Sequence, residues 1–113
     1  MAEPRAHPRY AVEIDAEVRW GGESIPARTR NVSRGGLAVL LSRPVPVGAD
    51  VTLAISLVFD EQAMSEPLPL HGRVVWCTPV AEDRFQLGAT FIGLRGEQRQ
   101  YIDMFLRYLS EGQ

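Results

Sequence analysis

Apolar and polar side chains alternate along the chain from residue 10 onward. Between Tyr10 and Trp20 the even positions carry apolar side chains, whereas the odd positions after Ala11 are all charged. Alternation with a period of two is typical of a strand with one buried face. Further short alternating or apolar runs predict five more strands, over residues 24–31, 37–41, 51–59, 68–77 and 85–91.

The segments between these runs are rich in turn-forming residues. Gly21-Gly22, residues 33–36, 43–48, 60–67 and 78–83 are predicted to connect the strands. The register places Trp20 and Trp76 on the inward side, so both are expected in the core. Turn signals at this frequency favour a small antiparallel barrel or sandwich, an all-β fold.

The period changes near residue 94. Apolar side chains then recur at helical spacing and predict one amphipathic helix over about residues 96–110. Its apolar stripe consists of Tyr101, Ile102, Phe105, Leu106 and Leu109. A helix with such a stripe must bury it, either across an open end of the barrel or against a partner copy. The sequence therefore leaves monomer and dimer open.

Composition excludes several kinds of chemistry. The chain has 113 residues, and all 12 of its basic residues are arginine. Without lysine there is no Schiff base and no phosphate-loop lysine. Cys77 is the one cysteine, and His7 and His71 are the two histidines, too few for a disulfide or a zinc knuckle. We therefore expect no catalytic residues, no metal and no cofactor, in a reducing cytoplasmic setting. No signal peptide or membrane-spanning segment is predicted.

Charge is distributed unevenly along the chain. Residues 1–47 contain seven arginines and five acidic residues, whereas residues 48–113 contain five arginines and nine acidic residues. The net charge is -2. A weakly basic half on an acidic protein suits a small anionic ligand better than a nucleic acid, which requires an extended basic face.

Two groups of polar residues lie in the basic half. Arg5 and Arg9 are four apart just before the first strand, and Pro8 favours an extended or turned conformation there. Such an arm could present two guanidinium groups to a ligand, or it could be a solvated tail. The second group is Asn31-x-Ser33-x-x-Gly36. It could read the edge of a polar heterocycle, or it could form a strand-end turn, for which Asn, Ser and Gly are common.

Together and in this order, the two groups resemble the paired signature of PilZ domains, which are bacterial receptors for cyclic di-GMP. The segments Gly72–Trp76 and Leu87–Phe91, followed by a terminal helix, resemble the later part of the same family. The resemblance covers residues 5 to about 109. It implies a six-stranded antiparallel Greek-key barrel with a C-terminal helix, divided into a flexible arm over residues 1–9 and a single domain over residues 10–113.

The resemblance also implies roles for individual residues. Arg5 and Arg9 correspond to the arginines that bind phosphate and guanine. Asn31 and Ser33 match positions that contact a guanine, and Gly36 matches a glycine that allows close approach. Auxiliary contacts are expected from Arg34, Gly35 and Gly88. Pro4 replaces an arginine that in some members favours two intercalated ligands, so one ligand per domain is expected.

The resemblance implies a function that needs no catalysis. A ligand that bridges the arm and the barrel would order the arm and create a surface for a downstream protein, whose identity the sequence does not give. The alternative is an adaptor of the same fold that binds protein and no nucleotide, for instance in type IV pilus or motility control.

Overall fold

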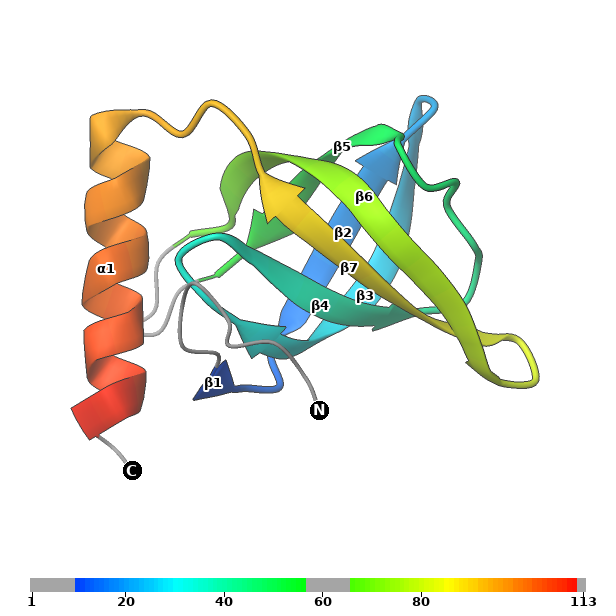
Figure 1. Cartoon of the computed structure of the whole chain (residues 1–113), viewed down its shortest axis with the longest axis horizontal. Coiled ribbons are helices and arrows are strands. Elements are labelled where there is room, and N and C mark those ends of the chain that lie inside the picture. The colour runs from blue at the N-terminus through cyan, green and yellow to red at the C-terminus, as the bar shows by residue number, and fades with distance from the viewer. Residues whose placement is uncertain (1–9, 57–65, 112–113) are drawn as a thin grey trace, which may run out of the picture.

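The computed structural model describes residues 10–56 and 66–111 as seven strands and one helix (Figure 1). The elements are β1 (Tyr10–Ala11), β2 (Asp15–Trp20), β3 (Glu23–Val32), β4 (Gly36–Leu41), β5 (Asp50–Ile55), β6 (Leu68–Ala81), β7 (Arg84–Phe91) and α1 (Gly96–Glu111). The predicted arginines Arg5 and Arg9 lie outside the described residues.

Six of the strands close into an antiparallel barrel. The strands run in the order β3-β2-β5-β6-β7-β4, and β4 pairs with β3 to complete the ring. β1 adds to the outside of this ring by pairing with β3. β5, β6 and β7 follow one another as neighbours, and β4 lies beside β7, which is a Greek-key arrangement. The predicted six-stranded barrel with a C-terminal helix is confirmed.

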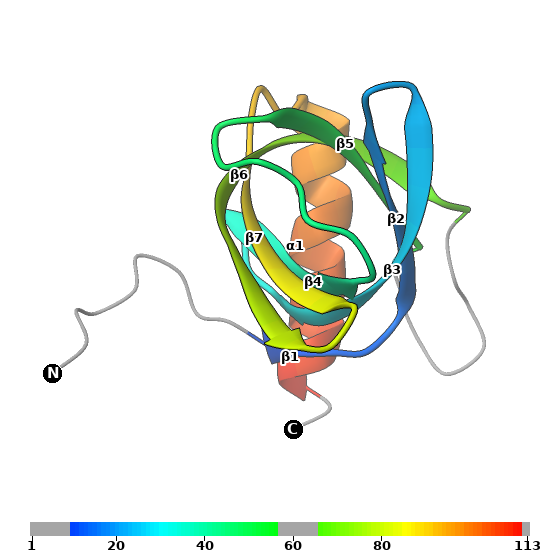
Figure 2. The ribbon, with the colours of Figure 1, turned by 90° about the vertical axis from the view of Figure 1, so that its right-hand side faces the viewer.

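Both ends of the barrel are covered. α1 lies across one end, as Figures 1 and 2 show from two directions. From this helix Ile102, Phe105 and Leu106 join the same buried cluster as the inward side chains of the strands. At the opposite end the connection between β4 and β5 crosses the barrel and buries Val45 (Figure 2). Leu109 packs against the same cluster, whereas Tyr101, which was predicted to belong to the stripe, is 42 % exposed. Most of the apolar stripe is therefore used within the chain.

The predicted first strand is divided in two. Its alternation is confirmed, because every even position is buried or partly buried, whereas every odd position except Glu17 is exposed. However, the register with β3 shifts by one residue between Ala11, which pairs with Asn31, and Asp15, which pairs with Arg28. The predicted strand 51–59 also ends earlier, at Ile55, and residues 57–59 lie outside the described residues.

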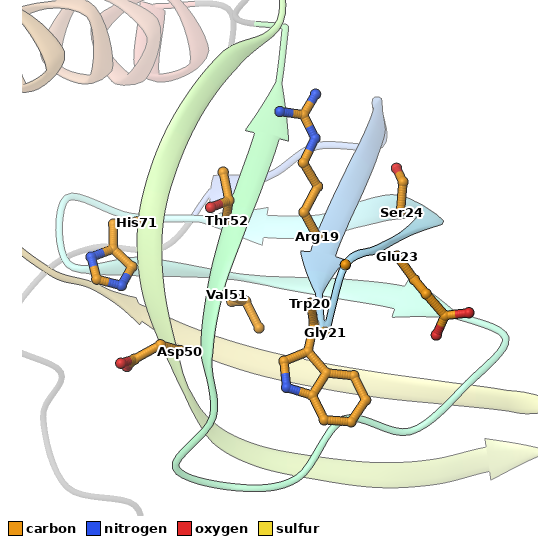
Figure 3. Close-up of a pocket in the computed structure, with 10 residues that line it drawn as sticks. Arg19, Trp20, Gly21, Glu23, Ser24, Asp50, Val51, Thr52 and His71 are labelled. Atoms are coloured by element: carbon orange, nitrogen blue, oxygen red, sulfur yellow. The ribbon is translucent and has the colours of Figure 1, made fainter.

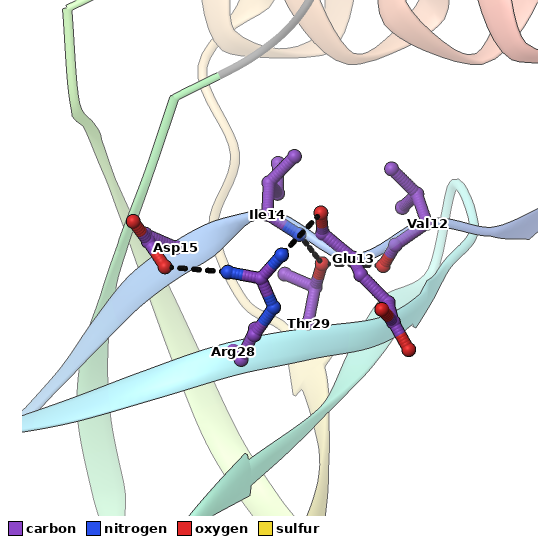
Figure 4. A network of polar contacts seen from close by, with 6 residues as sticks. All are labelled: Val12, Glu13, Ile14, Asp15, Arg28 and Thr29. Atoms are coloured by element: carbon purple, nitrogen blue, oxygen red, sulfur yellow. Dashed lines mark hydrogen bonds and ion pairs between the residues drawn. The ribbon is translucent and has the colours of Figure 1, made fainter.

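The buried hydroxyl of Thr29 holds this irregular segment in place (Figure 4). Its Oγ1 accepts a hydrogen bond from the Ile14 amide at 2.9 Å and donates one to the Val12 carbonyl at 2.5 Å. Nearby, Arg28 pairs with Asp15 at 2.8 Å on the outer side. Because Thr29 is completely buried, water cannot replace these bonds.

We expect Thr29→Val to lower the free energy of unfolding by about 1–3 kcal/mol, since valine keeps the shape but leaves two backbone groups without a partner. Denaturant unfolding measures this change. Thr78→Val, which removes a hydroxyl from an exposed position of β6, is the control and should change stability by less than about 0.5 kcal/mol. Equal effects of the two substitutions would contradict the role assigned to Thr29.

The last hairpin is tighter than the sequence indicated. A connection over residues 78–83 was predicted, but β6 continues to Ala81 and pairs there with Arg84. Only Glu82 and Asp83 form the turn, and Asp83 takes a positive φ of 55°. All residues of β6 beyond Cys77 are exposed, so an alternation of buried and exposed positions is absent there.

Candidate ligand-binding site

The second predicted motif spans the turn between β3 and β4, with Asn31 in β3, Ser33 in the turn and Gly36 at the start of β4. Ser33 is only 6 % exposed. Its amide donates to the Gly36 carbonyl at 2.8 Å. Its hydroxyl also donates to that carbonyl at 3.3 Å and accepts from the Gly35 amide at 3.2 Å. Ser33 therefore shapes the turn. A direct contact between Ser33 and a ligand stays a prediction.

The turn is also attached to the end of β7. The Gly35 carbonyl accepts the amide of Phe91 at 2.8 Å and the hydroxyl of Thr90 at 3.1 Å. A Cβ atom on Gly36 would lie 2.1 Å from the carbonyl oxygen of Ala89, so no side chain fits at this position. The close approach that Gly36 permits in this structure is therefore between the backbones of β4 and β7.

An outward-facing row of residues crosses five strands beside this turn. Directly opposed residues on antiparallel strands point to the same face. Asn31 is opposed by Ala11 and Ala38, Ala38 by Gly88, and Gly88 by Trp76. We call these five residues the outer row. Three of them are small, and two of these, Ala38 and Gly88, are buried between the Asn31 side and the Trp76 side of the row.

The indole of Trp76 lies directly against Gly88. A Cβ atom on Gly88 would lie 2.3 Å from two atoms of the indole ring. Gly88 thus permits this tight packing and also lies in the outer row; its contact with a ligand stays a prediction. Its alanine variant would force the indole to move.

The prediction that Trp76 belongs to the core is wrong. β6 has an irregularity between Val74 and Trp76, where Val75 is the additional residue. Val74 opposes Ala89 on the inner face, whereas Trp76 opposes Gly88 on the outer face. Trp76 remains partly exposed and is absent from the residues packed on the core, unlike Trp20. A one-residue shift in a strand reverses the face of every residue beyond it.

Arg34 points from the turn toward α1. Its Nε lies 2.9 Å from Oδ1 of Asp103, and its Nη2 lies 3.5 Å from Oδ2. Tyr10, which follows Arg9 in the sequence, lies in β1 beside the same end of the barrel. The structure therefore brings Asn31, Gly36 and Gly88 to neighbouring positions of β3, β4 and β7, where the two glycines are buried, and Arg34 lies on the α1 side of them.

A hollow of about 410 Å³ lies around the β2–β3 turn, on the other side of the barrel from the outer row (Figure 3). Its lining includes Arg19, Glu23, Asp50 and the exposed His71. The side-chain hydrogen bond from Arg43, together with charge attraction, holds the pKa of Glu23 below its ordinary value and raises the pKa of Arg43. Arg73 pairs with Asp50 at 3.1 Å. The acidic groups here already have cationic partners, and none of the predicted motifs lies in this hollow.

The described part of the chain contains neither a metal-binding group nor a membrane-spanning helix. Within residues 10–56 and 66–111, no three His, Cys, Asp or Glu side chains are grouped so that they could hold a metal ion. Across the same ranges α1 is the one helix, and it is too short and too polar to span a bilayer.

The family model of the PilZ domain matches residues 3–108. This chain belongs to the PilZ family. No curated relative matches it by sequence.

Several solved PilZ structures share the fold. MotI/DgrA of Bacillus subtilis, an inhibitor of motility, superimposes with a TM-score of 0.78 at 17 % identity over 99 % of this chain and 54 % of its own. The PilZ domain of YcgR from Escherichia coli with c-di-GMP gives 0.73 at 11 % identity over 97 % and 94 %. MrkH of K. pneumonia in complex with c-di-GMP gives 0.74 at 17 % identity over 98 % and 54 %. The chain thus spans about half the length of MotI and MrkH.

Trp76 is the residue of this surface that sequence reasoning missed. Its neighbour Val75 is an exposed apolar residue in a strand, but exposure is not visible in a sequence. The sequence did contain a sign of the irregularity. Adjacent residues of a regular strand face opposite sides, yet Val74 and Val75 are both apolar, which interrupts the alternation. In this PilZ domain the additional residue in β6 turns Trp76 to the outer face of the barrel, where it joins the outer row.

Proposed function

We propose that this chain is a receptor for cyclic di-GMP. The ligand would lie over the outer row, held by Asn31, Ser33 and Gly36 on the barrel and by Arg5 and Arg9 from the arm. The observation that carries the proposal is the register of the outer row, which places Asn31 and Trp76 on one outer face of the barrel, joined by the small residues Ala38 and Gly88, beside the family's motif turn. The PilZ neighbours whose structures contain c-di-GMP support it.

The chemistry of the surface matches that of the ligand. A guanine base offers acceptors at O6 and N7 and donors on its other edge, which an asparagine amide and backbone groups can pair with. Its flat face suits stacking on an aromatic side chain such as Trp76, a contact worth about 1–3 kcal/mol per base. The two phosphates suit arginine, which binds two oxygens at once.

Ligand binding would convert the arm into part of the protein surface. Residues 1–9 supply Arg5 and Arg9, and fixing a peptide segment costs conformational entropy. The charge-assisted contacts to the phosphates must exceed this cost. We infer that the ordered arm and the ligand together form the surface that a downstream protein recognises, with one ligand per domain.

The proposed role is regulatory and takes place in the cytoplasm without catalysis. A second candidate, an adaptor that binds protein and no nucleotide, shares the fold. The presence of Arg5, Arg9, Asn31, Ser33 and Gly36 in one chain favours the receptor.

Tryptophan fluorescence tests where the ligand lies. In the Trp20→Phe protein only Trp76 emits, and we expect saturating cyclic di-GMP to change its emission because a guanine stacks near the indole. In the Trp76→Phe protein only Trp20 emits, and its emission should stay constant, since Trp20 packs on the core. A response of Trp20 alone, or of neither residue while calorimetry reports binding, would contradict a site on the outer row.

A further inference from the structure

A hollow of about 420 Å³ lies where β1, the 33–35 turn and the second half of α1 meet. Its lining consists of Tyr10, Arg34, Asp103, Leu106, Arg107 and Ser110. Figure 1 shows α1 beside this end of the barrel. Tyr10 directly follows Arg9 in the sequence, so the polypeptide places the arm arginines within a few residues of the hollow.

The charges around this hollow are two guanidinium groups and one carboxylate. Asp103 engages Arg34 through both of its oxygens, at 2.9 and 3.5 Å. Arg107 is exposed and has no ion pair with any residue in the described ranges. A phosphodiester resembles this carboxylate in two respects, since it carries one negative charge and presents two oxygens that a guanidinium group can bind together.

We propose that this hollow is a phosphate subsite of the cyclic di-GMP site, formed by Arg34 and Arg107, and that Asp103 occupies Arg34 until the ligand arrives. The proposal rests on the receptor function proposed above. It adds α1 to the binding site. It also makes the Asp103 carboxylate a competitor of the ligand phosphate for binding to Arg34.

The exposure of the Arg34–Asp103 pair makes the exchange feasible. The two side chains are 58 % and 44 % exposed, and an ion pair in such contact with water is weak. A guanidinium group gains more from a phosphate that a second arginine also binds, because the charge-assisted bonds then act together. Ligand binding would break the ion pair between Arg34 in the turn and Asp103 in α1. By reciprocity, a stronger ion pair would lower the affinity for the ligand.

The test compares affinities for cyclic di-GMP in the whole chain by calorimetry. We expect Arg34→Ala and Arg107→Ala each to weaken binding about tenfold or more. Asp103→Asn should instead strengthen binding about two- to fivefold, because it frees Arg34. In the Arg34→Ala background, Asp103→Asn should have no further effect.

Two matched controls separate this effect from a change in net charge. Glu97→Gln removes the same charge as Asp103→Asn from the first turn of α1. Arg84→Ala removes an arginine at the β6–β7 hairpin, at the end of the molecule away from α1 (Figure 1). Both should leave affinity within about twofold. Thermal unfolding of each variant checks that the fold is kept.

The outcomes separate the two proposals. If the wild-type chain binds but Arg34→Ala and Arg107→Ala behave like Arg84→Ala, the phosphate subsite is overturned while the receptor function stands. If Asp103→Asn weakens binding, or strengthens it no more than Glu97→Gln, the competitor role is overturned. If the wild-type chain does not bind cyclic di-GMP, the receptor function fails and this proposal fails with it.

Discussion

Replacing Phe105 by alanine is expected to lower the free energy of unfolding by about 3–5 kcal/mol. Phe105 is completely buried and belongs to the helix that closes one end of the barrel. Its removal deletes the contacts of a large ring and leaves a cavity that the hydrogen-bonded strands cannot close by moving inward. A loss of this size corresponds to a fall in Tm of roughly 10–20 °C for a domain of this length. Thermal and denaturant unfolding both measure it.

Met104→Ala is the matched control for this prediction. Met104 is adjacent on the same helix but is 51 % exposed. Truncating it should change stability by less than about 1 kcal/mol. If Phe105→Ala destabilised the protein no more than Met104→Ala, α1 would not be the closure of the barrel that the structure indicates.

The affinity for cyclic di-GMP is expected to fall about 10- to 150-fold in the Arg9→Ala protein. This range follows from the loss of a hydrogen bond to a charged group, worth about 1.5–3 kcal/mol. The proposed function places Arg9 on a ligand phosphate or guanine, one residue before the strand that pairs beside Asn31. Arg5→Ala should have an effect in the same range. Calorimetry measures both affinities.

Arg84→Ala again serves as the control, since it removes the same charge from the β6–β7 hairpin. An unchanged affinity in both Arg5→Ala and Arg9→Ala would remove the arm from the site. A similar loss in all three variants would point to a general effect of charge. The thermal stability of Arg9→Ala should match that of the wild type, because the proposed role concerns the ligand and not the core.

Local patterns were sufficient to predict most of the barrel. The alternation over residues 10–20 and the helical spacing from Tyr101 to Leu109 each report which face is buried, and burial is what drives these elements together. The helix boundary was predicted within one residue. The choice between closing the barrel and pairing with another copy needed the structure, because one apolar stripe is compatible with both.

Irregularities in the strands could not be predicted. The break near Val12 depends on a hydroxyl of Thr29, 17 residues away in sequence, and the outward turn of Trp76 depends on one additional residue in β6. Neither irregularity is fixed by the pattern of apolar and polar residues from which the strands were predicted. For the same reason the sequence could name Arg34 as a candidate contact but could not show that Asp103, 69 residues away, holds it.

The sequence named candidate site residues that the structure places close together, and their contact with a ligand stays a prediction. Asn31, Gly36 and Gly88 lie at neighbouring positions of β3, β4 and β7. Ser33 was expected beside Asn31, and the structure assigns its hydroxyl to the turn. The contribution of Arg5 and Arg9 stays a prediction.

Calorimetric titration of the wild-type chain with cyclic di-GMP, with GTP and cyclic di-AMP as comparison ligands, tests the central claim most directly. We predict saturable binding of cyclic di-GMP with one ligand per chain and much weaker binding of the other two, because a surface that pairs with guanine leaves polar groups without partners when adenine replaces it. The absence of binding, or equal binding of cyclic di-AMP, would contradict the assignment of this chain as a cyclic di-GMP receptor.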